Sequence, residues 1–225
     1  MGKRGPKPKG KVKLEWSADF AYGIGLLVSD GCLSPDGRHI IFVSKDIEQI
    51  NNFLKAFRIK KIKIGATTSG YKGANAFRVQ FGDVLFCKFL DEIGITQAKS
   101  KTIDKIYVPK EYFFDFLRGS FDGDGTFYSY WDPRWKSSFM FYTEFISASK
   151  KHILWIREQI YKELKISGHI TNQSVGQTHQ LKYAKKDSLK LLVRLYAGKK
   201  SLYLKRKKLK IDKALSMIGE SRKDY

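Results

Sequence analysis

The sequence is poor in cysteine and proline, and it has no long apolar run. Of its 225 residues, two are Cys and five are Pro. Cys32 and Cys87 form no C-x-x-C pair, which argues against a disulfide framework and against a cysteine zinc site. The longest nearly uninterrupted apolar stretch, from Phe20 to Val28, is far shorter than the roughly 20 residues that a membrane-spanning helix needs. We therefore expect no membrane partner.

Acidic residues are scarce as well. The chain has 22 Asp and Glu against 43 Lys and Arg, a net charge of +21. Such a charge calls for a polyanionic partner, and nucleic acid is the leading candidate. The hydrophobic fraction of 42% is enough for a core. The basic N-terminus lacks the apolar segment of a signal peptide, so we expect a protein that is not secreted, in a prokaryotic cytoplasm or an organelle.

Apolar periodicity and turn residues predict an α+β fold. Helices are expected at 18–30, 46–58, 83–93, 110–124, 150–164, 187–197 and 201–217. Strands are expected at 38–44, 61–64, 77–81, 126–131, 136–147, 168–174 and 178–184. Each half therefore has the order helix, hairpin, helix, hairpin, helix, which indicates an internal duplication. The expected division is a flexible basic arm at 1–16, one repeat at 17–108 and a second at 109–225 that ends in a basic helix.

The first helix of each half ends in a related segment. GIGLLVSDG ends at Gly31 and LRGSFDGDG ends at Gly125. Gly25 and Gly119 occupy matching places, 94 residues apart. Glycine inside a helix costs roughly 1 kcal/mol relative to alanine, so its presence in both helices predicts that their backbones pack closely side by side.

Both segments also end in Asp-Gly, at Asp30 and Asp124. A carboxylate at a helix C-terminus lies at the negative end of the helix dipole, and two converging carboxylates repel each other. A hard divalent cation such as Mg²⁺, or Mn²⁺ in its place, relieves both penalties. Beside a DNA backbone, such an ion can activate water and stabilise a leaving oxygen. Asp30 and Asp124 are thus the candidate metal ligands and catalytic residues.

These paired segments resemble the signature helices of the LAGLIDADG homing endonucleases, in the single-chain form with two repeats. The resemblance extends over about 17–217; GIGLLVSDG departs from the pattern at its opening position and has Val28 where the family often has an acid. It implies two pseudo-symmetric αββαββα repeats, with the signature helices paired at the centre and two antiparallel four-stranded sheets forming a saddle for DNA. It also implies a monomer that hydrolyses one phosphodiester in each strand of a long asymmetric target, leaves short 3′ overhangs and mobilises an intervening element.

The resemblance further implies a basic residue near each active site, late in each repeat. Ala98-Lys99-Ser100-Lys101 matches Leu204-Lys205-Arg206-Lys207, so Lys99 and Lys205 are the expected pair, positioning water or stabilising charge on the phosphorus. Polar residues that organise water are expected at Ser44, Lys45, Ser149 and Lys150.

Base contacts are expected from the polar faces of the strands. The candidates are Arg38, Lys61, Lys63, Asn75, Arg78 and Gln80 in the first half, and Tyr128, Tyr130, Arg134, Lys136, Thr171, Gln173, Gln180 and Lys182 in the second.

Three other readings compete. Asp122-x-Asp124-Gly125 resembles part of an EF-hand, but Trp131 stands where the loop needs its bidentate Glu. A DNA-binding regulator on a decayed endonuclease fold is disfavoured because both Asp30 and Asp124 are retained. An RNA maturase that assists splicing stays open, because the same basic surface can bind structured RNA.

Overall fold

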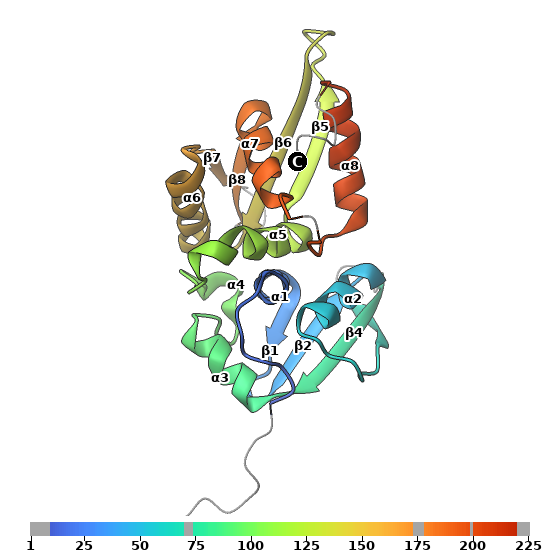
Figure 1. Ribbon diagram of the computed structural model, residues 1–225, viewed down its shortest axis with the longest axis vertical. Helices are drawn as coiled ribbons and strands as arrows, with labels where there is room; N and C mark the ends of the chain where they lie inside the picture. Colours follow the sequence, from blue (N-terminus) through green and yellow to red (C-terminus); the bar gives the residue numbers. More distant parts are fainter. Residues whose placement is uncertain (1–9, 70–73, 173–177, 199, 220–225) are drawn as a thin grey trace, which may run out of the picture.

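The computed structural model describes residues 10–69, 74–172, 178–198 and 200–219, and shows two α+β halves that meet along a central pair of helices (Figure 1). The first half comprises α1 (Ala18–Asp30), β1 (Gly31–Leu33), β2 (His39–Ser44), α2 (Ile47–Ala56), β3 (Gly65–Ser69), β4 (Ala74–Gly82), α3 (Val84–Glu92) and the short α4 (Lys99–Thr102). The second comprises the 3₁₀ turn η2 (Lys110–Tyr112), α5 (Phe113–Gly123), β5 (Thr126–Trp131), β6 (Phe139–Ser147), α6 (Lys150–Leu164), β7 (His169–Asn172), β8 (His179–Ala184), α7 (Lys185–Leu195) and α8 (Lys205–Ser216).

Within the described residues each half has one antiparallel sheet of four strands. The strand orders, β1-β2-β4-β3 and β5-β6-β8-β7, are equivalent, which confirms the duplicated α+β architecture. One face of each sheet packs on helices, α2 and α3 in the first half and α6 and α7 in the second. That face supplies core residues such as Phe42, Val79, Phe141 and Leu181. Most side chains on the opposite face are exposed or half-buried, as period-2 alternation requires.

Helices α1 and α5 pack closely because neither has side chains at the crossing points. A Cβ added at Gly25 would lie 2.1 Å from the carbonyl oxygen of Phe116, and one added at Gly119 would lie 2.0 Å from that of Tyr22. Ser29 Oγ donates to the carbonyl oxygen of Ser120 on the other helix at 3.3 Å. The predicted close approach of the two helices is confirmed, and it brings their C-terminal ends together.

Several predicted boundaries are wrong. The strand expected at 61–64 is irregular chain, and β3 begins at Gly65 instead. The alternation of Lys61-Ile62-Lys63-Ile64 misled because Ile62 and Ile64 pack on the core from outside the sheet. Likewise β6 begins at Phe139 and α8 at Lys205, later than predicted.

The segment that precedes α1 is tied to the first half. Asp83, at the start of α3, accepts hydrogen bonds from the backbone N–H groups of Lys11 and Val12, at 2.6 and 2.9 Å. Val12 is buried, and the Trp16 ring contacts Phe20 and Phe89. Residues 10–16 therefore do not form the expected flexible arm, while residues 1–9 lie outside the described residues. None of the described helices has the length and apolar content to cross a bilayer.

Candidate active site

Asp30 is the last residue of α1, and its carboxylate is held by a short polar relay. Gln49 on α2 donates from Nε2 to Asp30 Oδ2 at 2.7 Å, and Ser44 Oγ donates to Gln49 Oε1 at 2.9 Å. Burial and, to a smaller extent, the nearby Asp124 carboxylate raise the pKa of Asp30 to about 6, against the opposing effect of Gln49. The relay fixes one carboxylate oxygen at the meeting point of the two halves.

Asp124 follows α5 directly and lies beside the end of α1. A Cβ added at Gly123 would lie 2.3 Å from Ser29 Cβ and 3.1 Å from Asp30 Oδ2, so the end of α5 passes against the Asp30 carboxylate. The Asp124 side chain is exposed, yet the protein around it removes part of its hydration and raises its pKa, against the pull of Lys207 and Lys99. Two carboxylates that both resist ionisation therefore sit together at the helix ends.

A glycine follows each of the two aspartates because the backbone passes very close to the last turn of the preceding helix at that point. Gly31 is extended, with φ −88°, so it is not a left-handed cap. A Cβ at Gly31 would lie 2.6 Å from the Leu27 carbonyl oxygen, and one at Gly125 would lie 2.7 Å from that of Phe121. Both helices can thus pass directly into a strand of their own sheet.

Each helix end also holds a lysine. The Lys99 ammonium group donates to the Gly31 carbonyl oxygen and is buried. Lys207 on α8 donates to the carbonyl oxygens of Phe121 and Gly125, at 2.5 and 2.6 Å. Carbonyl groups at a helix C-terminus carry negative partial charge and attract cations. Burial lowers the pKa of Lys207 to about 8 and also lowers that of Lys99, while the neighbouring carboxylates act in the opposite direction.

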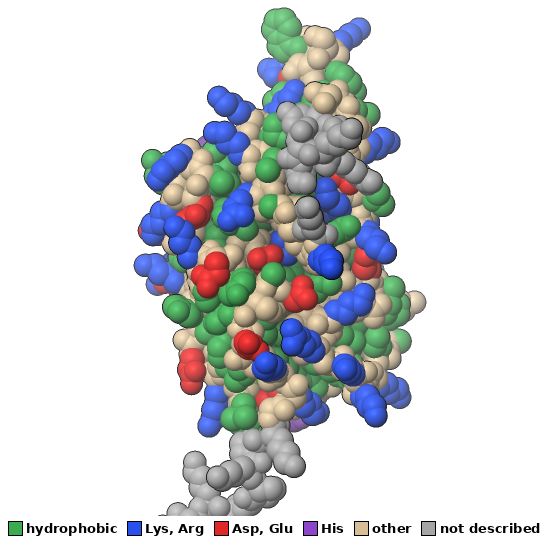
Figure 2. All heavy atoms as spheres, viewed as in Figure 1, with side chains coloured by type: hydrophobic (Ala, Val, Ile, Leu, Met, Phe, Trp, Pro, Cys, Tyr) green, Lys and Arg blue, Asp and Glu red, His purple; other side chains and the backbone are tan. Residues whose placement is uncertain are grey.

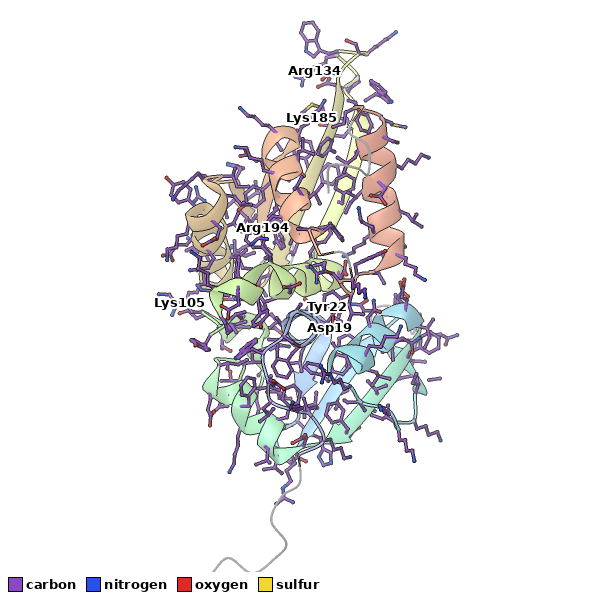
Figure 3. The ribbon with its side chains drawn as sticks, in the orientation of Figure 1. Asp19, Tyr22, Lys105, Arg134, Lys185 and Arg194 are labelled. Atoms are coloured by element: carbon purple, nitrogen blue, oxygen red, sulfur yellow. The ribbon has the colours of Figure 1, made fainter. Side chains whose placement is uncertain are left out.

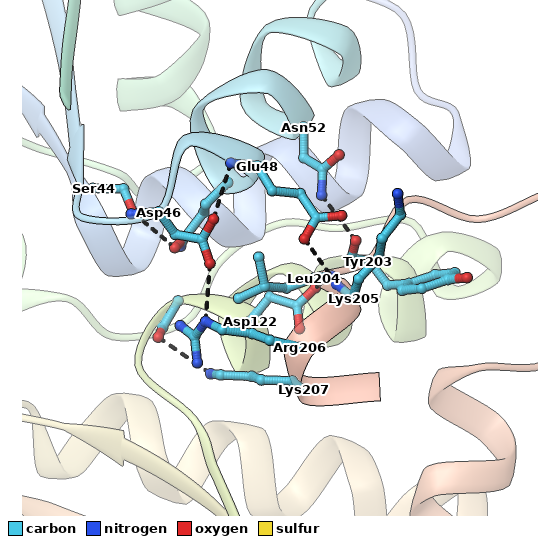
Figure 4. A network of polar contacts seen from close by, with 12 residues as sticks. Ser44, Asp46, Glu48, Asn52, Asp122, Tyr203, Leu204, Lys205, Arg206 and Lys207 are labelled. Atoms are coloured by element: carbon cyan, nitrogen blue, oxygen red, sulfur yellow. Dashed lines mark hydrogen bonds and ion pairs between the residues drawn. The ribbon is translucent and has the colours of Figure 1, made fainter. Parts of the chain in front are cut away.

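The expected second lysine, Lys205, is displaced from the site. Its side chain is exposed, and its backbone N–H donates to Glu48 Oε2 at 3.1 Å (Figure 4). Helix α8 begins at Lys205, so a residue two positions further along turns toward α5. Lys207 is therefore the counterpart of Lys99.

Asp122 is a further buried carboxylate at this site, which the sequence singles out only as part of an EF-hand-like pattern. It is fully buried on α5, where its Oδ2 accepts hydrogen bonds from Tyr22 Oη of α1 and from the backbone N–H of Leu204, both at 2.8 Å. Burial raises its pKa to about 6. These contacts anchor the start of α8 to the central helix pair, next to a second link in which Arg206 Nε lies 2.9 Å from Asp46 Oδ2 (Figure 4). The signal for Asp122 in the sequence is its place inside the second signature segment, two residues before Asp124.

Of the four expected water-organising residues, only Ser44 lies within the relay to Asp30. Lys45 and Lys150 are exposed. Ser149 is the N-cap of α6, where its Oγ accepts from the His152 N–H at 3.4 Å and donates to the Ile103 carbonyl oxygen. β2 ends at Ser44 and β6 ends at Ser147, so Ser147 is the counterpart of Ser44. By the same register His152 replaces Gln49, and its Nδ1 contacts the Asp104 carbonyl oxygen instead of a carboxylate.

The candidate base-reading residues divide by position. On the outward sheet faces, period-2 alternation places Arg78, Gln80, Tyr128, Tyr130, Thr171, Gln180 and Lys182. Asn75 has the parity of buried Val79 and so belongs to the opposite face, although it is exposed. Lys61 and Lys63 are exposed but precede β3, and Arg38 lies in the β1–β2 turn. Arg134 and Lys136 lie in the loop of the β5–β6 hairpin, with Arg134 near its far tip (Figure 3). Gln173 lies outside the described residues. Figure 2 shows basic side chains over both halves of the face in view.

Comparison with known proteins identifies the architecture. No family model and no curated protein matches the sequence. Among solved structures, the homing endonuclease I-WcaI bound to its DNA recognition sequence is 16% identical, with a TM-score of 0.57 over 92% of this chain and 95% of that one. The chain has the LAGLIDADG fold. I-DmoI in complex with DNA and Mn is 13% identical, with a TM-score of 0.51 over 80% and 97% of the two chains.

The same fold occurs outside these endonucleases. Full-length DUF199/WhiA from Thermatoga maritima is 16% identical, with a TM-score of 0.56 over 92% of this chain. This chain spans only 63% of the length of that protein. The LAGLIDADG fold is therefore shown for this chain.

Proposed function

We propose that this chain is a metal-dependent, site-specific endonuclease of double-stranded DNA. The observation that carries the proposal is the convergence of Asp30 and Asp124 at the ends of two closely packed helices, with a lysine held by backbone carbonyl groups at each end. Two adjacent carboxylates whose pKa values are raised by burial cost a folded protein stability, and such groups are concentrated at functional sites. The outward sheet faces and the charge of +21 fit a duplex DNA partner.

Asp30 and Asp124 would hold the metal. The described residues contain no group of three or more His, Cys, Asp or Glu side chains suited to a metal, so a site closed by the protein alone does not fit. Mg²⁺ commonly takes one or two carboxylates and completes its shell with water and substrate phosphates, and two carboxylates fit that pattern. When bound, such an ion lowers the pKa of water and stabilises the leaving oxygen. The I-DmoI complex with DNA and Mn supports the same assignment.

The residues of the chain have distinct parts in this proposal. Gln49 holds the Asp30 carboxylate in one orientation. Lys99 and Lys207, fixed by backbone carbonyl groups, stabilise charge that develops on the scissile phosphates. Since one chain supplies both carboxylates, a monomer is the proposed active species, and it cuts one bond in each strand to leave short 3′ overhangs. Mobility of the intervening element that encodes the protein is the proposed biological outcome.

The decisive test uses the locus that encodes the chain, rejoined without its intervening element. This duplex is incubated with the protein in Mg²⁺ or in EDTA, and the ends are mapped. We expect a Mg²⁺-dependent double-strand break at the junction. Asp30→Asn and Asp124→Asn should each abolish cleavage of at least one strand and leave binding intact, while Asp91→Asn, an exposed acid on α3, should cut normally.

Two outcomes would contradict the proposal. If the protein binds the junction duplex tightly but does not cut it with any divalent metal, a DNA-binding regulator on this fold is favoured. Absence of both binding and cleavage, together with assistance to splicing of the intervening RNA, would favour a maturase.

A further inference from the structure

The outward face of the second sheet carries a cluster of three tyrosines that the first sheet lacks. Tyr128 of β5 pairs directly with Tyr142 of β6, and Tyr130 is two residues further along β5. The ring centroids of Tyr128 and Tyr142 are 5.2 Å apart, and those of Tyr130 and Tyr142 are 6.2 Å apart. The planes of the three rings differ by 9 to 19°. The rings are therefore nearly parallel and support one another.

A lysine and a glutamate hold this tyrosine cluster in place. Lys182 Nζ lies 2.7 Å from Glu144 Oε1, and 5.5 and 5.7 Å from the ring centroids of Tyr128 and Tyr142. Glu144 is buried, and it raises the pKa of Lys182 together with the Tyr128 hydroxyl. Lys182 is thus committed to its own sheet, so it is poorly placed to serve as the base-reading residue expected from the sequence.

The equivalent face of the first sheet has different chemistry. Arg78 donates to the side-chain oxygen of Gln80, and these polar groups lie opposite Val43 and Ile41 of β2. A guanidinium and an amide can make directional hydrogen bonds to purine edges in the major groove. The tyrosine cluster instead offers rigid apolar carbon with a few hydroxyl groups. The two sheets therefore suit different base sequences.

The arrangement of the rings selects one class of contact. Proteins that bind unpaired bases offer open aromatic faces for stacking. Here the three rings stack beside one another with nearly parallel planes, and Lys182 lies near two of them. A stacked cluster of this kind offers a duplex apolar ring carbon and hydroxyl groups. In the major groove, the apolar group available to ring carbon is the 5-methyl group of thymine.

We propose that Tyr128, Tyr130 and Tyr142 recognise thymine in one half of the DNA target through its 5-methyl group. This inference rests on the proposed function, because it requires that the outward sheet faces bind duplex DNA. It predicts an asymmetric target in which the half bound by the second sheet is rich in thymine.

The test removes the methyl group and nothing else. Duplexes are selected from a random library with the cleavage-deficient Asp30→Asn/Asp124→Asn protein. The Kd is then measured on a selected duplex and on versions with deoxyuridine for thymine in one half. We expect about fourfold weaker binding for each contacted thymine, the value of one buried methyl group. The same replacement in the other half should have no comparable effect.

Variants link that effect to the tyrosines. In the cleavage-deficient background, Tyr128→Ala/Tyr142→Ala should bind the thymine and deoxyuridine duplexes equally, whereas Tyr142→Phe should keep the difference. If the double variant fails to fold, Tyr130→Ala is the alternative, because Tyr130 is 41% exposed. This variant should lose part of the difference in Kd between the thymine and deoxyuridine duplexes. Gln80→Ala on the first sheet is the matched control and should keep the whole difference.

The outcomes separate the two proposals. A selected duplex that binds tightly with no effect of deoxyuridine, or with an effect that the tyrosine variants leave unchanged, overturns the thymine inference alone. Failure to select any duplex overturns DNA binding, and with it both proposals.

Discussion

The ammonium group of Lys207 lies 2.6 Å from the carbonyl oxygen of Gly125, the residue that follows Asp124. This contact joins α8 to the C-terminal end of α5 and places a half-buried cation beside the candidate metal ligands. Lys205, two residues earlier on α8, is exposed. The two lysines therefore form a natural pair of test and control.

Lys207→Met should slow cleavage of at least one strand by about 10²-fold or more, because it removes a positioned donor from the site. Lys205→Met should change the rate by less than about twofold. Single-turnover rates measured separately for each strand at saturating protein distinguish the two variants. Equal effects of both substitutions would show that α8 contributes only general positive charge.

The Mg²⁺ requirement should increase in acid. The pKa of Asp30 is about 6, raised by burial and by Asp124, so below pH 6 the metal must displace a proton. The half-saturating Mg²⁺ concentration should then rise by roughly tenfold for each pH unit below 6 and level off above it. Titrations of cleavage rate against Mg²⁺ from pH 5 to pH 8 measure this.

Gln49→Leu should shift that acid limb to higher pH. The Gln49 amide donates to the Asp30 carboxylate and opposes the rise of its pKa. Without this donor the protonated form of Asp30 is favoured further. Ser44→Ala removes the hydroxyl group that donates to Gln49 and also accepts from the Asp46 N–H, and it should give a smaller shift in the same direction. An unchanged profile for Gln49→Leu would remove Gln49 from the site.

Asp30→Asn should stabilise the metal-free protein while it inactivates the enzyme. A carboxyl pKa that rises from 3.8 to about 6 on folding costs about 3 kcal/mol of stability at neutral pH, because the folded state disfavours the charged form. That cost disappears as the pH falls below the unfolded-state value. We expect a gain of up to about 3 kcal/mol in the free energy of unfolding, measured with urea in EDTA at pH 7. Asp91→Asn, at an exposed residue, should change it by less than about 0.5 kcal/mol.

Gly119→Ala should destabilise the protein despite the higher helix propensity of alanine. The added Cβ would lie 2.0 Å from the Tyr22 carbonyl oxygen, so α1 and α5 would have to separate. We expect a loss of at least about 2 kcal/mol in urea unfolding. Gly65→Ala is the control, since its Cβ would meet nothing closer than 3.8 Å. A neutral Gly119→Ala would mean that the helices are not in backbone contact.

The residues of the candidate site could be predicted where the evidence lies in a motif within one segment of the sequence. Asp30 and Asp124 close two copies of one helical segment, and a duplicated segment can be aligned to itself without a structure. Lys99 was found in the same way. Lys207 was missed because the basic run Lys205-Arg206-Lys207-Lys208 can be aligned in several registers, and only the start of α8 shows which side chain meets α5.

The duplication, the succession of helices and hairpins, and the small residues at the helix crossing can all be read from the amino-acid sequence, because each depends on the spacing of neighbours along one segment. Contacts between segments appear only in the folded chain. Asp122 is an anchor because Tyr22 and Leu204 converge on it, and Gln49 belongs to the site because the first turn of α2 lies beside the C-terminal end of α1. Tyr142 joined Tyr128 and Tyr130 only through the register of β5 against β6, since a shift of one residue would turn it to the other face of the sheet.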